Sequence, residues 1–175
     1  MTSESKLKVF ISHSFIDKDL TDEFEEKFRT HHYDCEIFYD MTAYAGSFNE
    51  RLLQKFAGSC DIAILLLSSK FIASDYCNNK ELPILKERQK KGEVIIIPVL
   101  FQACDFIKWN TEKGGDLTFF QIKKGDLRSS RLSGPNSEIN NRADLTYEDV
   151  GPRNTEGYHF KLYEWIKKIR KAQMI

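Results

Sequence analysis

One carboxylate and several aromatic residues follow the most apolar run of the chain. The run at 62–67, IAILLL, is too short to cross a membrane and too apolar for a strand with one wet face, so it predicts a strand buried on both faces of a parallel sheet. Phe71, Tyr76 and Cys77 come after it, and Glu81 stands where a new helical pattern begins. Because ligands of open parallel sheets collect beyond the carboxyl ends of the strands, Glu81 is the leading candidate site residue. The alternative is a solvated acid in the first turn of a helix, where the helix dipole favours negative charge.

Four common kinds of site lack their sequence signature. Neither GxGxxG nor GxxxxGKS/T occurs, which disfavours a dehydrogenase and a P-loop NTPase. No carboxylate cluster and no His or Cys spacing indicates a metal, so none is expected. A response-regulator domain would need an acidic cluster, whereas the first predicted strand ends in Ser12, His13 and Ser14.

The cysteines and two of the histidines are expected to be inert. His31 and His32 lie between a predicted helix and a predicted strand, which indicates surface residues. The cysteines are far apart and form no CxxC pair, so free thiols are expected, with zinc or disulfides as the alternatives. They are Cys35, Cys60, Cys77 and Cys104.

Predicted strands and helices alternate along the first hundred residues. Strands are expected at 6–12, 35–39, 62–67 and 94–100, and helices at 17–30, at 48–56 with Gly58 ending the second, and from about 79–83 to 91. Pro98 places the fourth strand near one edge of the sheet or at a strand end. Alternation of this kind predicts an α/β fold with a parallel sheet and right-handed crossovers. Three loops, 12–16, 39–48 and 68–81, should then meet at one edge.

The last third of the chain is less regular. A short helix is expected at 105–109, a fifth, edge strand at 117–122, and a long excursion at 125–152, which is rich in Gly, Ser, Asn and Asp. A final helix begins at Thr155 and runs to about 171–173. Its outer face is basic and is expected to be solvated. We therefore expect a single domain over 1–175, with its core at about 6–110, the irregular segment at 111–154 and the last helix at 155–173.

Charge and hydropathy exclude some partners. Lys+Arg and Asp+Glu both number 26 in 175 residues, so the formal net charge is zero. This balance argues against nucleic acid or an anionic membrane as a direct partner. No window resembles a transmembrane span and the polar start is unlike a signal peptide, so a cytoplasmic location is expected.

Four segments, in order and spacing, resemble the conserved boxes of Toll/interleukin-1 receptor (TIR) domains of the bacterial type. They are 9–14 with 17–19, 38–40 with the loop through 46, 68–77 with 81–83, and 97–100 with 104–106. The resemblance covers about 6–110 well and the remainder only by order of elements. The chain departs from many relatives in two places. Tyr44-Ala45-Gly46 stands where many relatives have an Arg-Pro-Gly or Pro-Gly step. Glu81 lies four residues after Cys77, whereas the acid lies three residues after the cysteine in many relatives.

The resemblance implies a fold and an activity. The fold is flavodoxin-like, with three layers and a five-stranded parallel sheet flanked by helices. The activity is that of an NAD+ nucleosidase, a glycohydrolase or ADP-ribosyl cyclase that cleaves the nicotinamide–ribose bond to give ADP-ribose or a cyclic or conjugated signal in bacterial antiphage (antiviral) defence. NAD+ is then the substrate, and no cofactor is required.

The chemistry of that reaction suits a carboxylate. Nicotinamide leaves as a neutral molecule, and the transition state resembles an oxocarbenium ion that an ionised carboxylate stabilises. Glu81 at a helix entry is expected to stay ionised and to act as electrostatic stabiliser, ribose-hydroxyl ligand or transient nucleophile. The resemblance implies substrate contacts nearby, through stacking or hydrogen bonds. The candidates are Phe10, Ser12, His13, Ser14, Tyr39, Phe71, Tyr76 and Cys77.

Two other kinds of function remain open. TIR domains also act as scaffolds through self-association or partner binding, and their active sites are commonly completed between subunits. Homo-oligomers are therefore expected, with an effector or sensor module as a further partner. The 41–47 loop is the expected contact, through Met41, Thr42, Tyr44, Gly46 and Ser47. The other alternative is a small-molecule or nucleotide-binding α/β domain of unrelated chemistry.

Overall fold

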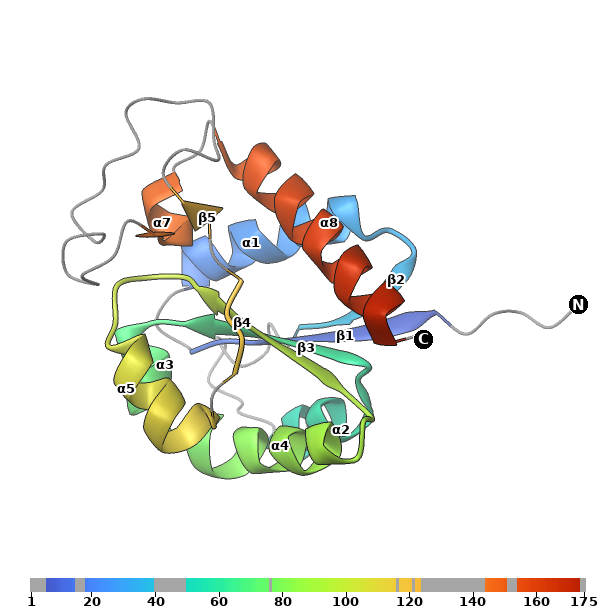
Figure 1. Cartoon of the computed structure of the whole chain (residues 1–175), viewed down its shortest axis with the longest axis vertical. Coiled ribbons are helices and arrows are strands. Elements are labelled where there is room, and N and C mark those ends of the chain that lie inside the picture. Colours follow the sequence, from blue (N-terminus) through green and yellow to red (C-terminus); the bar gives the residue numbers. More distant parts are fainter. Residues whose placement is uncertain are drawn as a thin grey trace, which may run out of the picture.

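A parallel sheet forms the centre of the molecule. The computed structural model describes residues 6–14, 18–39, 50–75, 77–115, 117–120, 122–123, 144–150 and 154–173. Within these residues the main sheet has four strands in the order β2-β1-β3-β4 (Figure 1). The strands are β1 Leu7–Ser12, β2 Cys35–Phe38, β3 Ile62–Leu67 and β4 Ile95–Leu100. All their pairings are parallel, as the alternation of predicted strands and helices requires.

Helices cover both faces of this sheet (Figure 1). One face packs against α1 Lys18–His31, α7 Tyr147–Val150 and α8 Thr155–Gln173, and the other packs against α2 Glu50–Ser59, α3 Ser69–Ala73, α4 Leu82–Lys90 and α5 Phe106–Trp109. The side chains of β3 alternate between the two cores, and every residue of the strand is buried. The predicted three-layer α/β fold and the doubly buried third strand are confirmed. No helix among the described residues is long and apolar enough to span a membrane.

Within the described residues, little of the expected fifth strand at 117–122 is formed. Phe120 makes an isolated parallel bridge to Val99, beside β4, where a fifth strand would lie. Leu117 cannot extend this pairing, because its backbone N–H and C=O are both hydrogen-bonded to the side chain of Asn110 at 2.9 Å. Strand β5, Ile122–Lys123, instead pairs antiparallel with β6, Asp144–Leu145. The predicted fifth strand is therefore much shorter than expected, but its one bridge lies at the expected edge of the sheet, beside β4.

Pro98 lies within β4 without breaking the sheet. Its carbonyl accepts a hydrogen bond from the Phe120 N–H at 3.0 Å, on the side of β4 away from β3. The N–H and C=O of a strand residue point the same way, so the N–H that proline lacks would also face this sparsely paired side. The prediction that Pro98 marks an edge of the sheet is confirmed for the ladder that the structure describes.

Several helix boundaries differ from the predictions. Gly58 lies inside α2, which continues to Ser59, so it does not end the helix. Helix α3 was not predicted, and a π-turn, η3 Cys77–Glu81, precedes α4. Helix α5 continues into a second π-turn, η4 Asn110–Gly114, which ends at Gly115 with a φ of 69°. All four cysteines are free thiols, as predicted.

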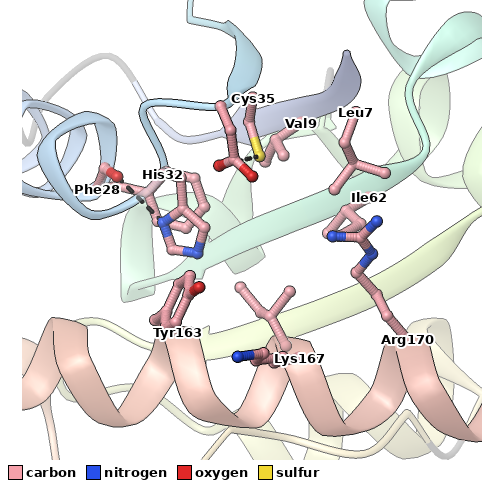
Figure 2. Close-up of a pocket in the computed structure, with 11 residues that line it drawn as sticks. Leu7, Val9, Phe28, His32, Cys35, Ile62, Tyr163, Lys167 and Arg170 are labelled. Carbon is pink, nitrogen blue, oxygen red and sulfur yellow. Dashed lines mark hydrogen bonds between the residues drawn. The ribbon is translucent and has the colours of Figure 1, made fainter. Parts of the chain in front are cut away.

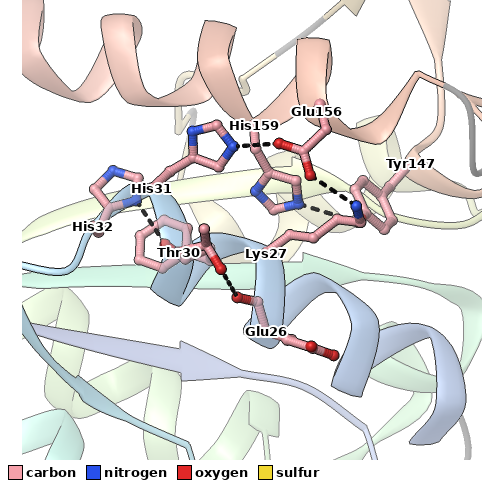
Figure 3. Close-up of polar contacts among 9 residues, drawn as sticks. Glu26, Lys27, Thr30, His31, His32, Tyr147, Glu156 and His159 are labelled. Carbon is pink, nitrogen blue, oxygen red and sulfur yellow. Dashed lines mark hydrogen bonds and ion pairs between the residues drawn. The ribbon is translucent and has the colours of Figure 1, made fainter.

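Helix α8 is joined to α1 and α7 by polar contacts as well as by the core (Figure 3). The exposed Glu156 carboxylate lies 2.9 Å from Lys27 Nζ and 3.0 Å from His31 Nε2. His159 of the same helix is fully buried, and its Nε2 lies 3.1 Å from the Tyr147 hydroxyl. His32 is also buried, at 4% exposure, so its prediction as a surface residue was wrong. The cause is tertiary, since His32 lies beneath Tyr163 of α8.

Candidate active site

The carboxyl ends of β1 and β3 lead into the segments that carry the candidate residues. Ser12 is the last residue of β1 and pairs in register with Leu65 of β3. After β3 the buried Ser68 caps α3, because its Oγ accepts a hydrogen bond from the Phe71 N–H at 3.1 Å. This cap turns the chain sharply at the edge of the sheet and brings the next segment back over β1.

A π-turn aims Glu81 at the end of β1. Turns of this kind are rare inside helices and occur often at functional sites, because they shift a side chain relative to the regular helix. Here η3 spans Cys77–Glu81 and continues into α4, with Pro83 in the first turn of that helix. Ser74 Oγ accepts a hydrogen bond from the Cys77 N–H at 3.2 Å and so helps to start the turn.

Glu81 is buried against Ser12. Only 3% of Glu81 is exposed, and Ser12 Oγ donates a hydrogen bond to its Oε1 at 3.0 Å, with Oε2 at 3.4 Å. Burial raises the pKa of Glu81 to about 8, and the hydrogen bond from Ser12 only partly opposes this shift. The expectation that a helix entry would keep Glu81 ionised is wrong for the free protein. Its own backbone is helical and its side chain makes no capping hydrogen bond, so burial dominates.

Cys77 and His13 lie beside this pair. The buried Cys77 thiol points to the His13 carbonyl, with Sγ 3.9 Å from the oxygen. Burial, and then the charge of Glu81, raise the pKa of Cys77 to about 12, so it remains a neutral thiol and not a nucleophile.

Tyr39 completes one wall of the site. Its ring packs on that of His13, with centroids 4.7 Å apart and planes inclined by 38°. The Tyr39 hydroxyl donates a hydrogen bond to Asp22 Oδ1 at 2.6 Å, which ties the end of β2 to α1. Ser14 is buried next to His13. The structure therefore brings Ser12 and Cys77 to Glu81, with His13 next to Cys77 and Tyr39 next to His13.

Two of the proposed stacking residues are instead core residues. Phe10 and Phe71 are each 1% exposed. Phe10 packs on Phe56 with ring centroids 6.0 Å apart, and Phe71 meets Trp109 edge-on at 6.2 Å. Neither ring offers a free face to a ligand, because alternation along β1 and the inward turn of α3 point them into the core. Both rings therefore belong to the core in this structure, and their role as substrate contacts stays a prediction.

Other predicted site residues lie outside the described part of the chain. Tyr76, which precedes the π-turn, is one of them. The expected contact loop at 41–47, with Met41, Thr42, Tyr44, Gly46 and Ser47, is another. Their roles stay predictions.

Asn78 supports the π-turn and was not recognised in the sequence. Its amide nitrogen donates to the carbonyls of Phe71, Ile72 and Ser74, at 3.0, 3.2 and 2.7 Å. Its Oδ1 accepts a hydrogen bond from the Trp109 indole N–H at 2.6 Å. Asn78 thus joins α3, η3 and α5 three positions before Glu81. Its partners lie up to 31 residues away, so no local pattern reveals this role.

The described residues hold no group of three His, Cys, Asp or Glu side chains that could bind a metal ion. The described groups at this edge of the sheet are the buried Glu81 carboxyl group, the hydroxyls of Ser12 and Ser14, the neutral Cys77 thiol and the Tyr39 ring. These groups can stabilise a developing positive charge and hydrogen-bond a polyhydroxylated ligand.

Comparisons with known proteins found similar chains. A protein of Sinorhizobium fredii (strain NBRC 101917 / NGR234), "Uncharacterized protein y4lF", is 36% identical over 100 residues, which cover 56% of this chain and 31% of that protein. The chain therefore spans about a third of the length of this curated relative.

A solved structure, described as the activated Roq1 resistosome directly recognizing the pathogen effector XopQ (TIR domains), aligns with 62% of this chain and 72% of its own. The sequence identity is 22% and the TM-score is 0.43. The sequence profile of the TIR domain matches residues 9–133, which include most of β1, all of β2, β3 and β4, and the π-turn. The chain belongs to the TIR domain family.

Proposed function

We propose that this TIR domain cleaves NAD+ at the nicotinamide–ribose bond, with Glu81 as the catalytic residue. The observation that carries the proposal is the buried pair of Ser12 and Glu81 at the carboxyl edge of the sheet. The Glu81 carboxyl group is buried, so it lies in a region of low dielectric, and the Ser12 hydroxyl contacts it. Such a region strengthens any interaction between the carboxylate and a cationic transition state.

The raised pKa fits a step that depends on the substrate. The nicotinamide ring of NAD+ carries a positive charge, and an opposite charge within a few ångströms favours the ionised form of a carboxyl group. Binding of NAD+ would therefore lower the pKa of Glu81 and release its proton. The carboxylate then stabilises the positive charge that develops on the ribose as neutral nicotinamide leaves. Whether it does so through space, through a ribose hydroxyl or by transient covalent attack is decided by the product and its stereochemistry.

A second candidate is a TIR scaffold that acts by self-association or partner binding. The low exposure of Glu81 favours it, because a buried carboxyl group with one hydrogen-bond donor is also what a purely structural role would show. In this case Glu81 would stabilise the junction of β1 with η3, and the 41–47 loop would carry the contacts. The two candidates differ in whether any assembled state of the protein consumes NAD+.

The test is nicotinamide release from NAD+ by the purified chain at high concentration, with a crowding agent that favours assembly, since TIR active sites are commonly completed between subunits. Release by the parent and its loss in folded Glu81→Gln would support the enzyme. Chromatography of the second product would then separate linear from cyclic or conjugated ADP-ribose and so bear on the proposed role in antiphage signalling. Absence of release, together with absence of NAD+ binding, would favour the scaffold.

A further inference from the structure

A cavity of about 190 Å³ lies at the edge of the sheet where the strands begin, opposite the edge that carries Glu81. Figure 2 shows residues that line it. Leu7, Cys35 and Ile62 line it, and these are the first residues of β1, β2 and β3. Tyr163, Lys167 and Arg170 of α8 border it from the other side. Ser12, which binds Glu81, is the last residue of β1, so the length of that strand separates the two places.

His32 lines this cavity and holds an unused hydrogen-bond acceptor. Its Nδ1 lies 3.1 Å from the Phe28 carbonyl oxygen, which can only accept, so Nδ1 carries the proton. Burial lowers the pKa of His32, which keeps the ring neutral and leaves a bare lone pair on Nε2. Nε2 is buried and has no hydrogen-bond partner within the described part of the chain. Figure 2 shows Phe28 on one side of the ring and Tyr163 of α8 on the other. Nε2 has almost no area accessible to water in this conformation, so a donor from a ligand or a water reaches it once the ring turns toward the cavity.

The charges around the cavity favour an anion. Lys167 and Arg170 carry two positive charges into its lining, and Asp34 carries one negative charge. Cys35 adds none, because burial raises the pKa of its thiol to about 11. The lining is therefore positive by one unit. The described residues hold no metal-binding group that would use the lone pair of His32 in another way.

The size and the polarity of the cavity limit what fits. A cavity of about 150 Å³ accepts a molecule as large as benzene, so this one accommodates roughly six to eight non-hydrogen atoms. Guanidinium groups bind carboxylates in a bidentate manner. We propose that the cavity binds a small hydroxy-carboxylate, whose hydroxyl donates to His32 Nε2 and whose carboxylate pairs with Arg170 and Lys167. Because the ligand would contact β1, α1 and α8 together, its binding would stabilise the packing of α8 on the sheet.

Lactate is the probe that tests this proposal. The side-chain nitrogen resonances of ¹⁵N-labelled protein report the Nε2 of His32 directly, since a hydrogen bond to the bare lone pair shifts its resonance. Propionate has the same carboxylate but no hydroxyl, and propane-1,2-diol has hydroxyls but no charge. Lactate is expected to bind saturably and at least about tenfold more tightly than either, because each analogue leaves one polar group of the site without its partner.

Exposed basic residues of α8 provide matched variants. Lys167→Gln and Arg170→Gln are each expected to weaken lactate binding by about tenfold, which corresponds to about 1.4 kcal/mol. Lys168→Gln removes the same charge from the next exposed position, which does not line the cavity, and should leave binding unchanged. His32→Asn keeps a donor for the Phe28 carbonyl and deletes Nε2, so it should abolish the preference for lactate over propionate. Equal binding of lactate and propionate, no saturable binding of lactate, or an equal effect of Lys168→Gln would overturn the proposal.

Discussion

Ser12 Oγ lies 3.0 Å from Glu81 Oε1 and joins the end of the first strand to a π-turn 69 residues later. Among the described residues, this hydrogen bond is the contribution that lowers the pKa of the Glu81 carboxyl group, which burial raises to about 8. Its geometry connects the fold to the proposed chemistry, because both the strand end and the π-turn are needed to form it.

The pH dependence of stability should reveal the buried Glu81. Its folded-state pKa of about 8 lies above the ordinary 4.5, so between these values the folded state binds more protons than the unfolded state. Stability from this group is complete below about pH 4.5 and is lost as the pH rises through about 8, by at most about 1.4 kcal/mol per pH unit. Urea denaturation across this range should show the loss in the parent.

Two variants isolate that effect. Glu81→Gln should remove the fall in stability toward high pH. Glu87→Gln, the same substitution at an exposed position of α4, should retain it. An identical pH dependence in all three proteins would contradict the burial of a protonated Glu81.

The pH dependence of turnover should separate free enzyme from substrate complex. The parameter kcat/KM reports ionisations of the free enzyme, so it should rise with pH through about 8. The parameter kcat reports the complex, where the nicotinamide cation lowers the pKa of Glu81, so its rise should come at lower pH.

Ser12→Ala removes the one hydrogen bond that favours the carboxylate. The rise in kcat/KM should therefore move to higher pH and its neutral-pH value should fall by about tenfold, as expected for a lost hydrogen bond to a charged group. Activity restored at high pH would distinguish this positioning role from simple misfolding. Coincident profiles for parent and Ser12→Ala would contradict it.

Trp109→Phe tests the support of the π-turn. The change leaves the buried Oδ1 of Asn78 without its donor at 2.6 Å, at a cost of about 1–3 kcal/mol in the free energy of unfolding. Trp165→Phe makes the same change on α8, where the partly buried ring contacts Phe120. Denaturation should show a clearly smaller loss there. Equal losses would mean that ring volume, and not the hydrogen bond to Asn78, decides the outcome.

His159 should make α8 sensitive to acid. Burial lowers its pKa to about 3 from the ordinary 6.5, so the unfolded state binds more protons between these values. Stability from the neutral ring is complete above about pH 6.5 and is lost as the pH falls toward 3. His159→Gln keeps a polar atom near the Tyr147 hydroxyl without a titrating ring. Its stability, measured by thermal unfolding, should depend less on pH below about 6.5 than that of the parent.

Local patterns predicted most of the strands and helices but not the environment of the site. The uninterrupted apolar run of β3 and the fourfold spacing of Leu20, Phe24 and Phe28 in α1 identify their elements without tertiary information. The shortness of the fifth strand was not predictable from local pattern, because it depends on one side-chain contact. The Asn110 amide hydrogen-bonds both backbone groups of Leu117, which keeps them from pairing with β4.

The burial of Glu81 had no local signal either. An acid two residues before a proline is typical of an exposed first turn, and the π-turn and the approach of β1 turn this one inward. The same holds for His32, whose burial depends on a helix more than a hundred residues later, as its contact with Tyr163 shows. Glu81 was selected from its place after a buried strand, and that placement is what the structure retains.

The most direct test of the proposed function is the initial rate of nicotinamide release from NAD+ by the parent, Glu81→Gln and Glu87→Gln under the same assembled conditions. Because Glu81 supplies the charge that stabilises the transition state, Glu81→Gln should lose at least about a hundredfold in rate, as removal of such a group does elsewhere. Glu87→Gln should retain the parental rate. Equal rates in the parent and a folded Glu81→Gln would contradict the assignment of Glu81 as the catalytic residue.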